Sequence, residues 1–295
     1  MAKKNKAIET NDGAGRLYVV ATPIGNLEDI TLRALRVLKE ADLIVCEDTR
    51  ETQKLLSHFD ISKRLVSYHE HNEITRASEI VIELEQGAKV ALVSDAGTPA
   101  ISDPGYRLVH LCVRHGIEVV PIPGASAFVA ALAASGMPIE EFAFVGFLPS
   151  RPTARRKALR ALADEQRTIA LYEAPHRLLD TLEDALEILG NRPAVVAREV
   201  TKTYEEFLRG HIEDLLDTAR KRAPRGEITL LIGPPDGQAK HMETESATKL
   251  PLARRVDEIA AERGVDRKAA LKQAARERGL TRREAYKQLL ITRDE

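Results

Sequence analysis

Apolar and polar positions alternate along the first 124 residues in a way that predicts strands separated by helices. Short apolar runs, typical of strands buried on both faces, occupy residues 17–21, 43–46, 65–68, 90–93 and 118–121. Segments with helical spacing lie between them, at residues 31–40, 52–58, 75–86 and 106–115. Because strands and helices alternate strictly, the pattern predicts a mostly parallel sheet covered on both faces.

The pattern changes after residue 124, where the predicted strands follow one another more closely. They occupy residues 141–147, 168–172, 194–199, 203–210 and 227–232, and the third and fourth could pair as a hairpin. Closer strands favour an α+β domain with antiparallel pairing. We therefore expect a disordered N-terminus (1–15), an α/β domain (16–124), an α+β domain (125–233), a linker rich in Pro, Gly and polar residues (234–249) and a basic helical module (250–295).

Composition narrows the class of protein. A hydrophobic content of 43% supports a sizeable core, and a net charge of -1 excludes a uniformly basic coat. Cys46 and Cys112 have no motif spacing, so we interpret them as buried thiols in a reducing compartment. No apolar run approaches the roughly 20 residues of a membrane span, and the first fifteen residues lack the apolar segment of a signal peptide. A cytoplasmic protein without membrane contact is expected.

The loops that follow the predicted strands are the candidates for chemistry. The segment from Ser94 to Gly105 carries two prolines, two glycines and two aspartates, which is more than a plain turn needs. Similar small-residue loops occur at residues 22–26, 47–50 and 123–126, and the ends of parallel strands share one edge. A Gly-Ala-Gly at residues 13–15 precedes the first strand, so a dinucleotide fingerprint is excluded. His69 and His71 lack a third ligand at suitable spacing, so no metal site is expected.

Six segments in order along the chain carry a resemblance to a known family: Val20 to Asp29, Cys46 to Arg50, Ser94 to Gly105, Pro123 to Ser126, Tyr172 to Arg177 and Ala197 to Lys202. They resemble the ribosomal RNA small subunit methyltransferase I family, within the tetrapyrrole-methylase-like, or class III, methyltransferases. The resemblance implies an α/β fold in which two domains hold S-adenosylmethionine between them, a homodimer, and methylation of the ribose 2′-hydroxyl of a decoding-centre cytidine in 16S ribosomal RNA of the small subunit.

The resemblance also implies which residues form the site. The expected cofactor-binding residues are Pro23, Gly25, Asn26, Ser94, Asp95, Gly97, Thr98, Pro99, Pro123, Gly124, Ser126, Tyr172 and Glu173. A ribose hydroxyl is a poor acid and would be helped by a general base, so the expected catalytic residues are Asp48, Arg50, Glu199 and Lys202. Two alternatives stay open: Asp95 could cap its own turn, and Asp48 with Arg50 could form the first turn of the following helix.

Basic segments predict where RNA phosphates bind. Residues 151–160 contain five Lys or Arg and no acid, and residues 263–287 carry nine Lys or Arg against three acids. The predicted RNA-binding residues are Arg151, Arg155, Arg156, Lys157, Arg160, Arg198, Arg267, Lys268, Lys272, Arg282 and Arg283. An internal ion pair of Arg198 with Glu173 is the alternative for that arginine. Two other functions stay open: methylation of a tetrapyrrole precursor, which 4% aromatic residues and no Trp disfavour, and a non-catalytic role in ribosome assembly.

Overall fold

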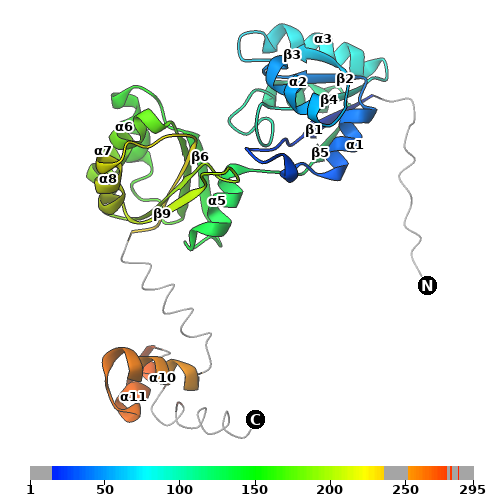
Figure 1. Cartoon of the computed structure of the whole chain (residues 1–295). Helices are drawn as coiled ribbons and strands as arrows, with labels where there is room; N and C mark the ends of the chain where they lie inside the picture. The colour runs from blue at the N-terminus through cyan, green and yellow to red at the C-terminus, as the bar shows by residue number, and fades with distance from the viewer. Residues whose placement is uncertain (1–14, 236–251, 278–279, 281–284, 286–295) are drawn as a thin grey trace, which may run out of the picture.

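A computed structural model of the chain describes residues 15–235, 252–277, 280 and 285. Almost all of the predicted disordered N-terminus and linker lies outside the described residues, and so do Arg282 and Arg283. Two α/β lobes account for residues 16–232, and Figure 1 shows them side by side.

The first lobe is built on a five-stranded sheet in which every pair of neighbours is parallel. Its strand order is β3-β2-β4-β1-β5. The strands are β1 (Arg16–Val20), β2 (Leu43–Cys46), β3 (Arg64–Ser67), β4 (Lys89–Leu92) and β5 (Glu118–Ile122). The helices are η1 (Leu27–Asp29), α1 (Leu32–Glu40), α2 (Thr49–His58), α3 (Glu73–Glu85) and α4 (Tyr106–Arg114). The predicted parallel sheet is confirmed.

Successive residues of these strands pack into two different cores. In β2, Leu43 and Val45 join a cluster with the apolar stripes of α3 and α4. Ile44 and Cys46, on the other face, pack with α1 and α2. A strand buried on both faces has no polar alternation, which explains why the apolar runs were continuous.

The second lobe has a mixed sheet in the order β6-β7-β10-β8-β9. Only the β6–β7 pair is parallel, and the predicted hairpin is confirmed as the antiparallel pair β8–β9. The strands are β6 (Phe142–Phe147), β7 (Thr168–Glu173), β8 (Pro193–Arg198), β9 (Glu206–His211) and β10 (Ile228–Ile232). The helices are α5 (Ala127–Ser135), α6 (Pro152–Ala161), η2 (Pro175–Arg177), α7 (Leu178–Leu189) and α8 (Ile212–Lys221).

Helices cover both faces of this second sheet. One face packs against α6, α7 and α8, and the opposite face packs against α5. The α5 cluster also includes Ile24, which comes from the loop after β1 in the first lobe. Apolar packing therefore joins the two lobes at the base of the space between them.

A third group of helices follows in the chain. The helices α10 (Leu252–Arg263) and α11 (Arg267–Glu277) pack through their own apolar cluster, which includes Val256, Ile259 and Ala270. This bears out the helical periodicity of the C-terminal segment over the part that can be described. Throughout residues 15–235 and 252–277, no helix combines the length and apolarity needed to cross a membrane.

Candidate active site between the two lobes

Loops at the carboxyl ends of three parallel strands are tied together by hydrogen bonds. The N–H of Thr22, after β1, donates to Gly97 O at 2.8 Å, and Gly97 N–H donates back to Thr22 O at 3.1 Å. The N–H of Asp48, after β2, donates to Asp95 Oδ1 at 2.9 Å. A third lobe-spanning contact is implied by Gly146 in β6, where a Cβ would lie 2.9 Å from Ser102 Oγ. The loop from Ser94 to Gly105 is thus fixed by its neighbours on both sides.

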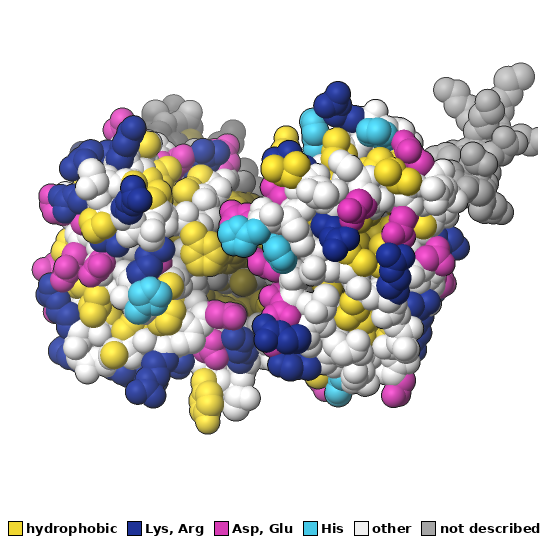
Figure 2. Space-filling view, turned by 90° about the horizontal axis from the view of Figure 1, so that it is seen from above, with side chains coloured by type: hydrophobic (Ala, Val, Ile, Leu, Met, Phe, Trp, Pro, Cys, Tyr) yellow, Lys and Arg dark blue, Asp and Glu magenta, His cyan; other side chains and the backbone are white. Residues whose placement is uncertain are grey.

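A cavity of about 570 Å³ lies between these loops and the second sheet. Figure 2 shows the hollow between the lobes, with hydrophobic side chains at its floor and acidic ones along its walls. The first lobe lines it with Ile24, Ala96, Gly97, Thr98, Ile101, Ser102 and Asp103. The second lobe lines it with Ser126, Ala127, Phe147, Tyr172, Glu173, Ala174, Pro175, Ala197, Glu199, Val200, Lys202, Gly226, Glu227, Ile228 and Thr229. Its size and mainly apolar lining suit a small organic ligand.

One wall of the cavity carries an ammonium group between two carboxylates. Lys202 Nζ lies 2.9 Å from Glu199 Oε1 and 3.0 Å from Glu227 Oε2. Burial lowers the pKa of Lys202, but the hydrogen bonds to Glu199 and Glu227 outweigh it and leave that pKa raised. The backbone N–H of Glu227 and the Lys202 ammonium both donate to Glu199 and lower its pKa. Both groups are therefore charged at neutral pH.

Two glycines make room for this cluster. A Cβ at Gly25 would overlap the Lys202 side chain, and a Cβ at Gly226 would overlap the Glu199 carboxyl group. The turn itself is strained, because Glu199 has φ +51° and Thr201 has φ +71°. Strained non-glycine residues of this kind concentrate at functional sites.

Glu173, at the end of β7, is held in a fixed position at the cavity wall. Its side chain is 1% exposed, and it accepts hydrogen bonds from Thr181 Oγ1 at 2.6 Å and Ala174 N at 2.8 Å. The Arg177 guanidinium lies 3.4 Å away. A buried carboxylate with this many partners is a rigid part of the wall.

Comparison with known proteins gives this arrangement a family. Residues 16–216 match the family model described as tetrapyrrole (corrin/porphyrin) methylases. A protein named ribosomal RNA small subunit methyltransferase I from Halalkalibacterium halodurans is 50% identical over 92% of this chain and 94% of its own length. The proteins of that name from Thermotoga maritima and Escherichia coli O157:H7 are 52% and 44% identical over 74% and 90% of this chain, and 98% and 96% of their own lengths. The chain belongs to the ribosomal RNA small subunit methyltransferase I family.

Solved structures agree with this family at the level of the fold. A cobalt precorrin-4 methyltransferase matches with a TM-score of 0.57 at 22% identity, over 74% of this chain and 94% of that one. A uroporphyrin-III C-methyltransferase from Thermus thermophilus, solved with S-adenosylhomocysteine, matches with a TM-score of 0.53 at 21% identity, over 74% of this chain and 97% of that one. The two-lobed methylase fold expected from the sequence is therefore shown.

The cavity of this methyltransferase I family member contains part of the predicted cofactor-binding set. The predicted residues that line it are Gly97, Thr98, Ser126, Tyr172, Glu173, Glu199 and Lys202. The others lie in the same loops but do not line it: Pro23, Gly25, Asn26, Ser94, Asp95, Pro99, Pro123 and Gly124. Several of these have a structural role instead. Ser94 Oγ donates to the carbonyls of Ala96 and Gly97, and Asn26 accepts from Glu28 N at 3.1 Å.

Two alternatives left open by the sequence are resolved by these contacts. Asp95 bonds to the neighbouring loop at Asp48 N rather than capping its own turn. Asp48 caps α2 by accepting from Arg50 N at 2.8 Å, and its carboxylate pairs with Arg50 Nη2 at 2.7 Å. Hydrogen bonds from the side chain and backbone of Arg50 lower the pKa of Asp48 to about 2. Neither Asp48 nor Arg50 lines the cavity, and a carboxyl group with that pKa is a poor base.

Sequence reasoning missed several residues of the cavity. Asp103 lies within the motif from Ser94 to Gly105 but was not assigned to the site, although an acid before Pro-Gly in that loop was a usable signal. Gly226 and Glu227 precede β10, whose place in the middle of the second sheet brings them to the cavity. Phe147 closes β6 beside the same space. No local pattern marks these last three positions.

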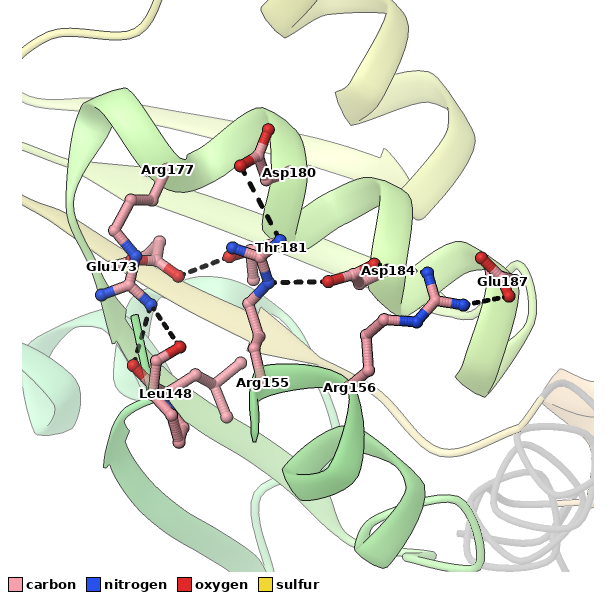
Figure 3. A network of polar contacts seen from close by, with 10 residues as sticks. Leu148, Arg155, Arg156, Glu173, Arg177, Asp180, Thr181, Asp184 and Glu187 are labelled. Carbon is pink, nitrogen blue, oxygen red and sulfur yellow. Dashed lines mark hydrogen bonds and ion pairs between the residues drawn. The ribbon is translucent and has the colours of Figure 1, made fainter. Parts of the chain in front are cut away.

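The assignment of Arg155 to RNA is wrong, because that side chain is buried within the second lobe. Only 5% of it is exposed, and its Nε donates to Asp184 Oδ2 at 2.7 Å. Figure 3 shows Arg155 lying between α6 and α7, with Asp180 on one side and Asp184 on the other. Arg156 is also held by α7, where it pairs with Asp184 at 2.9 Å and with Glu187. The counter-charges come from a helix far along the chain.

The remaining basic residues stay predictions for RNA contact. Arg151, Lys157 and Arg160 are exposed on the same helical segment, as are Arg267, Lys268 and Lys272 in α11. Arg198 bonds through Nε to Glu206 Oε2 at 2.9 Å, so the predicted alternative partner Glu173 is wrong.

Proposed function

We propose that this chain is an S-adenosylmethionine-dependent enzyme that methylates the ribose 2′-hydroxyl of a decoding-centre cytidine in 16S ribosomal RNA of the small subunit. The observation that carries the proposal is the 50% identity, over 92% of the chain, with a protein named ribosomal RNA small subunit methyltransferase I. The match spans all six segments that line or support the cavity.

The residues of the cavity fit S-adenosylmethionine as a ligand. Ile24, Ile101 and Ala127 provide apolar walls, and the backbone at Gly97 is open because its φ of +82° needs no side chain. The carboxylates of Glu199 and Glu227 suit a ligand that carries positive charge. When bound, S-adenosylmethionine supplies a methyl group on a cationic sulfur.

The charged cluster at Lys202 positions groups rather than moving protons. The pKa of Lys202 is raised and that of Glu199 is lowered, so neither accepts a proton readily near neutral pH. The pair closes the cavity from the second lobe and packs over Gly25 of the first. Catalysis in such a site rests mainly on orientation, which is worth several orders of magnitude in rate.

We also propose that RNA contacts the exposed residues Arg151, Lys157 and Arg160, because phosphate binding depends on unpaired cationic charge. A homodimer is part of the proposal. The edge strand β6 exposes Phe142 and Val145 at 41% and 39%, and a second copy that covers them would remove apolar surface from water. Light scattering of the purified chain tests this state, and a monomer at micromolar concentration contradicts it.

The function is tested by transferring a labelled methyl group to small subunits that lack the modification. We expect label in RNA, mapped to the 2′-oxygen of one cytidine. Label in a base, or in a ribosomal protein, would overturn the proposal. Small subunits that already carry the modification are the matched control and are expected to accept no label.

A further inference from the structure

A second cavity of about 520 Å³ opens beside the first, and the two share a wall. Ser102 and Asp103 line both cavities. The second one is otherwise lined by first-lobe residues: Glu47, Glu70, Glu73, Pro104, Gly105, Tyr106, Arg107 and His110. A group placed in it would meet the contents of the first cavity at Asp103. Two reactants that must exchange one atom need this kind of adjacency.

The second cavity carries a ready stacking surface. Tyr106, at the start of α4, is 74% exposed, although a large aromatic side chain is usually covered. Its ring stacks on His110, with centroids 5.8 Å apart and an angle of 24° between the planes. The ring is thus held in one orientation while one face stays open to a ligand.

The charges around this surface select the kind of ligand. Glu47, Glu70 and Glu73 would repel a phosphate, and the one arginine of the lining, Arg107, lies 3.3 Å from Glu73. Among the described residues, no group of His, Cys, Asp or Glu is arranged to hold a metal ion. An uncharged ring with an amino group fits, because carboxylates accept from the cytosine N4 amine and aromatic rings stack on bases.

We propose that the second cavity binds the acceptor nucleoside, a cytidine turned out of the RNA, with its base on Tyr106 and its ribose hydroxyl at Asp103. This inference rests on the proposed function and names the acceptor half of the same site. Enzymes that modify one nucleotide commonly take it out of the stack and enclose its base.

The proposed role of Asp103 is to accept the proton of the ribose hydroxyl. As the 2′-oxygen bonds to the methyl carbon, the carbon–sulfur bond breaks and its electron pair stays on sulfur, which becomes neutral. The hydroxyl proton passes to the Asp103 carboxylate. No other reactant is needed, and the charge balances, because one cation is neutralised and one carboxylate is protonated.

The surroundings of Asp103 suit this role. Burial raises the pKa of Asp103 to about 6, and the negative charges of Glu47 and Asp95 raise it further against a hydrogen bond from Ser94. The other charged or titratable groups that line the two cavities with it are Glu70, Glu73, Tyr106, Arg107, His110, Tyr172, Glu173, Glu199, Lys202 and Glu227. A carboxyl group with a pKa near 6 is ionised at pH 7.5 and still basic enough to take a proton.

The test compares Tyr106→Ala, Tyr106→Phe and Asp103→Asn in the full chain. Tyr106→Ala is expected to raise KM for unmodified small subunits, and the Kd for their RNA with S-adenosylhomocysteine present, by about 5-fold to 100-fold. Tyr106→Phe keeps the ring and is expected to restore both. Asp103→Asn is expected to lower kcat by about 100-fold or more, to leave the RNA Kd within about 3-fold, and to abolish the fall in kcat below pH 6.

Controls separate this inference from the proposed function. Asp42→Asn lies at the opposite edge of the same sheet, where Asp42 accepts from Lys89 N, and it is expected to leave kcat unchanged. Calorimetry with S-adenosylhomocysteine is expected to give the wild-type Kd for Tyr106→Ala and Asp103→Asn, which also shows that the variants fold. If the wild type methylates the subunit and both variants keep its KM and kcat, the inference is overturned and the function stands. If the wild type transfers no methyl group to RNA, the proposed function fails first.

Discussion

Replacing Arg155 by Ala is predicted to destabilise the fold without weakening RNA binding. The guanidinium is 5% exposed and bonds to Asp184, whose own side chain is 9% exposed. Removing the arginine leaves a buried carboxylate without its closest cation. Breaking a buried pair from one side costs about 3–5 kcal/mol. Because Arg156 still reaches Asp184 at 2.9 Å, we expect the low end, about 3 kcal/mol of unfolding free energy.

The matched control is Arg160→Ala, which removes an exposed arginine from the same helix, α6. It is expected to change the unfolding free energy by no more than about 0.5 kcal/mol. Denaturant unfolding followed by circular dichroism measures both variants, and filter binding measures their RNA affinity at one salt concentration. We expect Arg155→Ala to bind RNA as the wild type does, and Arg160→Ala to bind more weakly. Equal stability of the two variants would refute the reasoning.

Three further predictions concern the site and the C-terminal helices. Asp48 is expected to titrate near pH 2 by NMR and to return to its ordinary range near 3.8 in Arg50→Ala; because the folded pKa is lowered, the pair stabilises the fold above about pH 4 and loses this effect as pH falls towards 2, and an unshifted midpoint in the wild type would contradict the pairing. Gly25→Ala is expected to push Lys202 aside and lower the unfolding free energy by about 1–3 kcal/mol, with slower methyl transfer; unchanged stability would show that the loop relaxes freely. Deleting residues 249–295 is expected to weaken RNA binding and leave the S-adenosylhomocysteine Kd unchanged by calorimetry, and RNA binding equal to that of the full chain would exclude a docking role.

The first lobe could be predicted from sequence because its signals are local. Each parallel strand is buried on both faces and gives a continuous apolar run, and each connecting helix has its own stripe. In the second lobe the helix α8 was missed. Its start depends on a capping box between His211 and Asp214, directly after β9 with no intervening loop, so strand and helix signals merged.

The site was predictable only where its residues follow strands that share one edge. Gly97 and Thr98 were found because the loops after β1, β4 and β5 meet by topology. Glu227 reaches the cavity only because β10 is inserted between β7 and β8, which no local pattern reveals. The opposite error occurred at Arg155. A basic stretch without acids implied free charge, but its counter-charge Asp184 lies 29 residues further along the chain.

The most direct test of the central claim is a crystal structure of the full chain with S-adenosylhomocysteine. The account predicts density in the cavity between the lobes, in contact with Gly97, Thr98 and Tyr172, while the cavity beside Tyr106 stays free for the acceptor. Density for the ligand beside Tyr106, or at any place outside the space between the lobes, would contradict it.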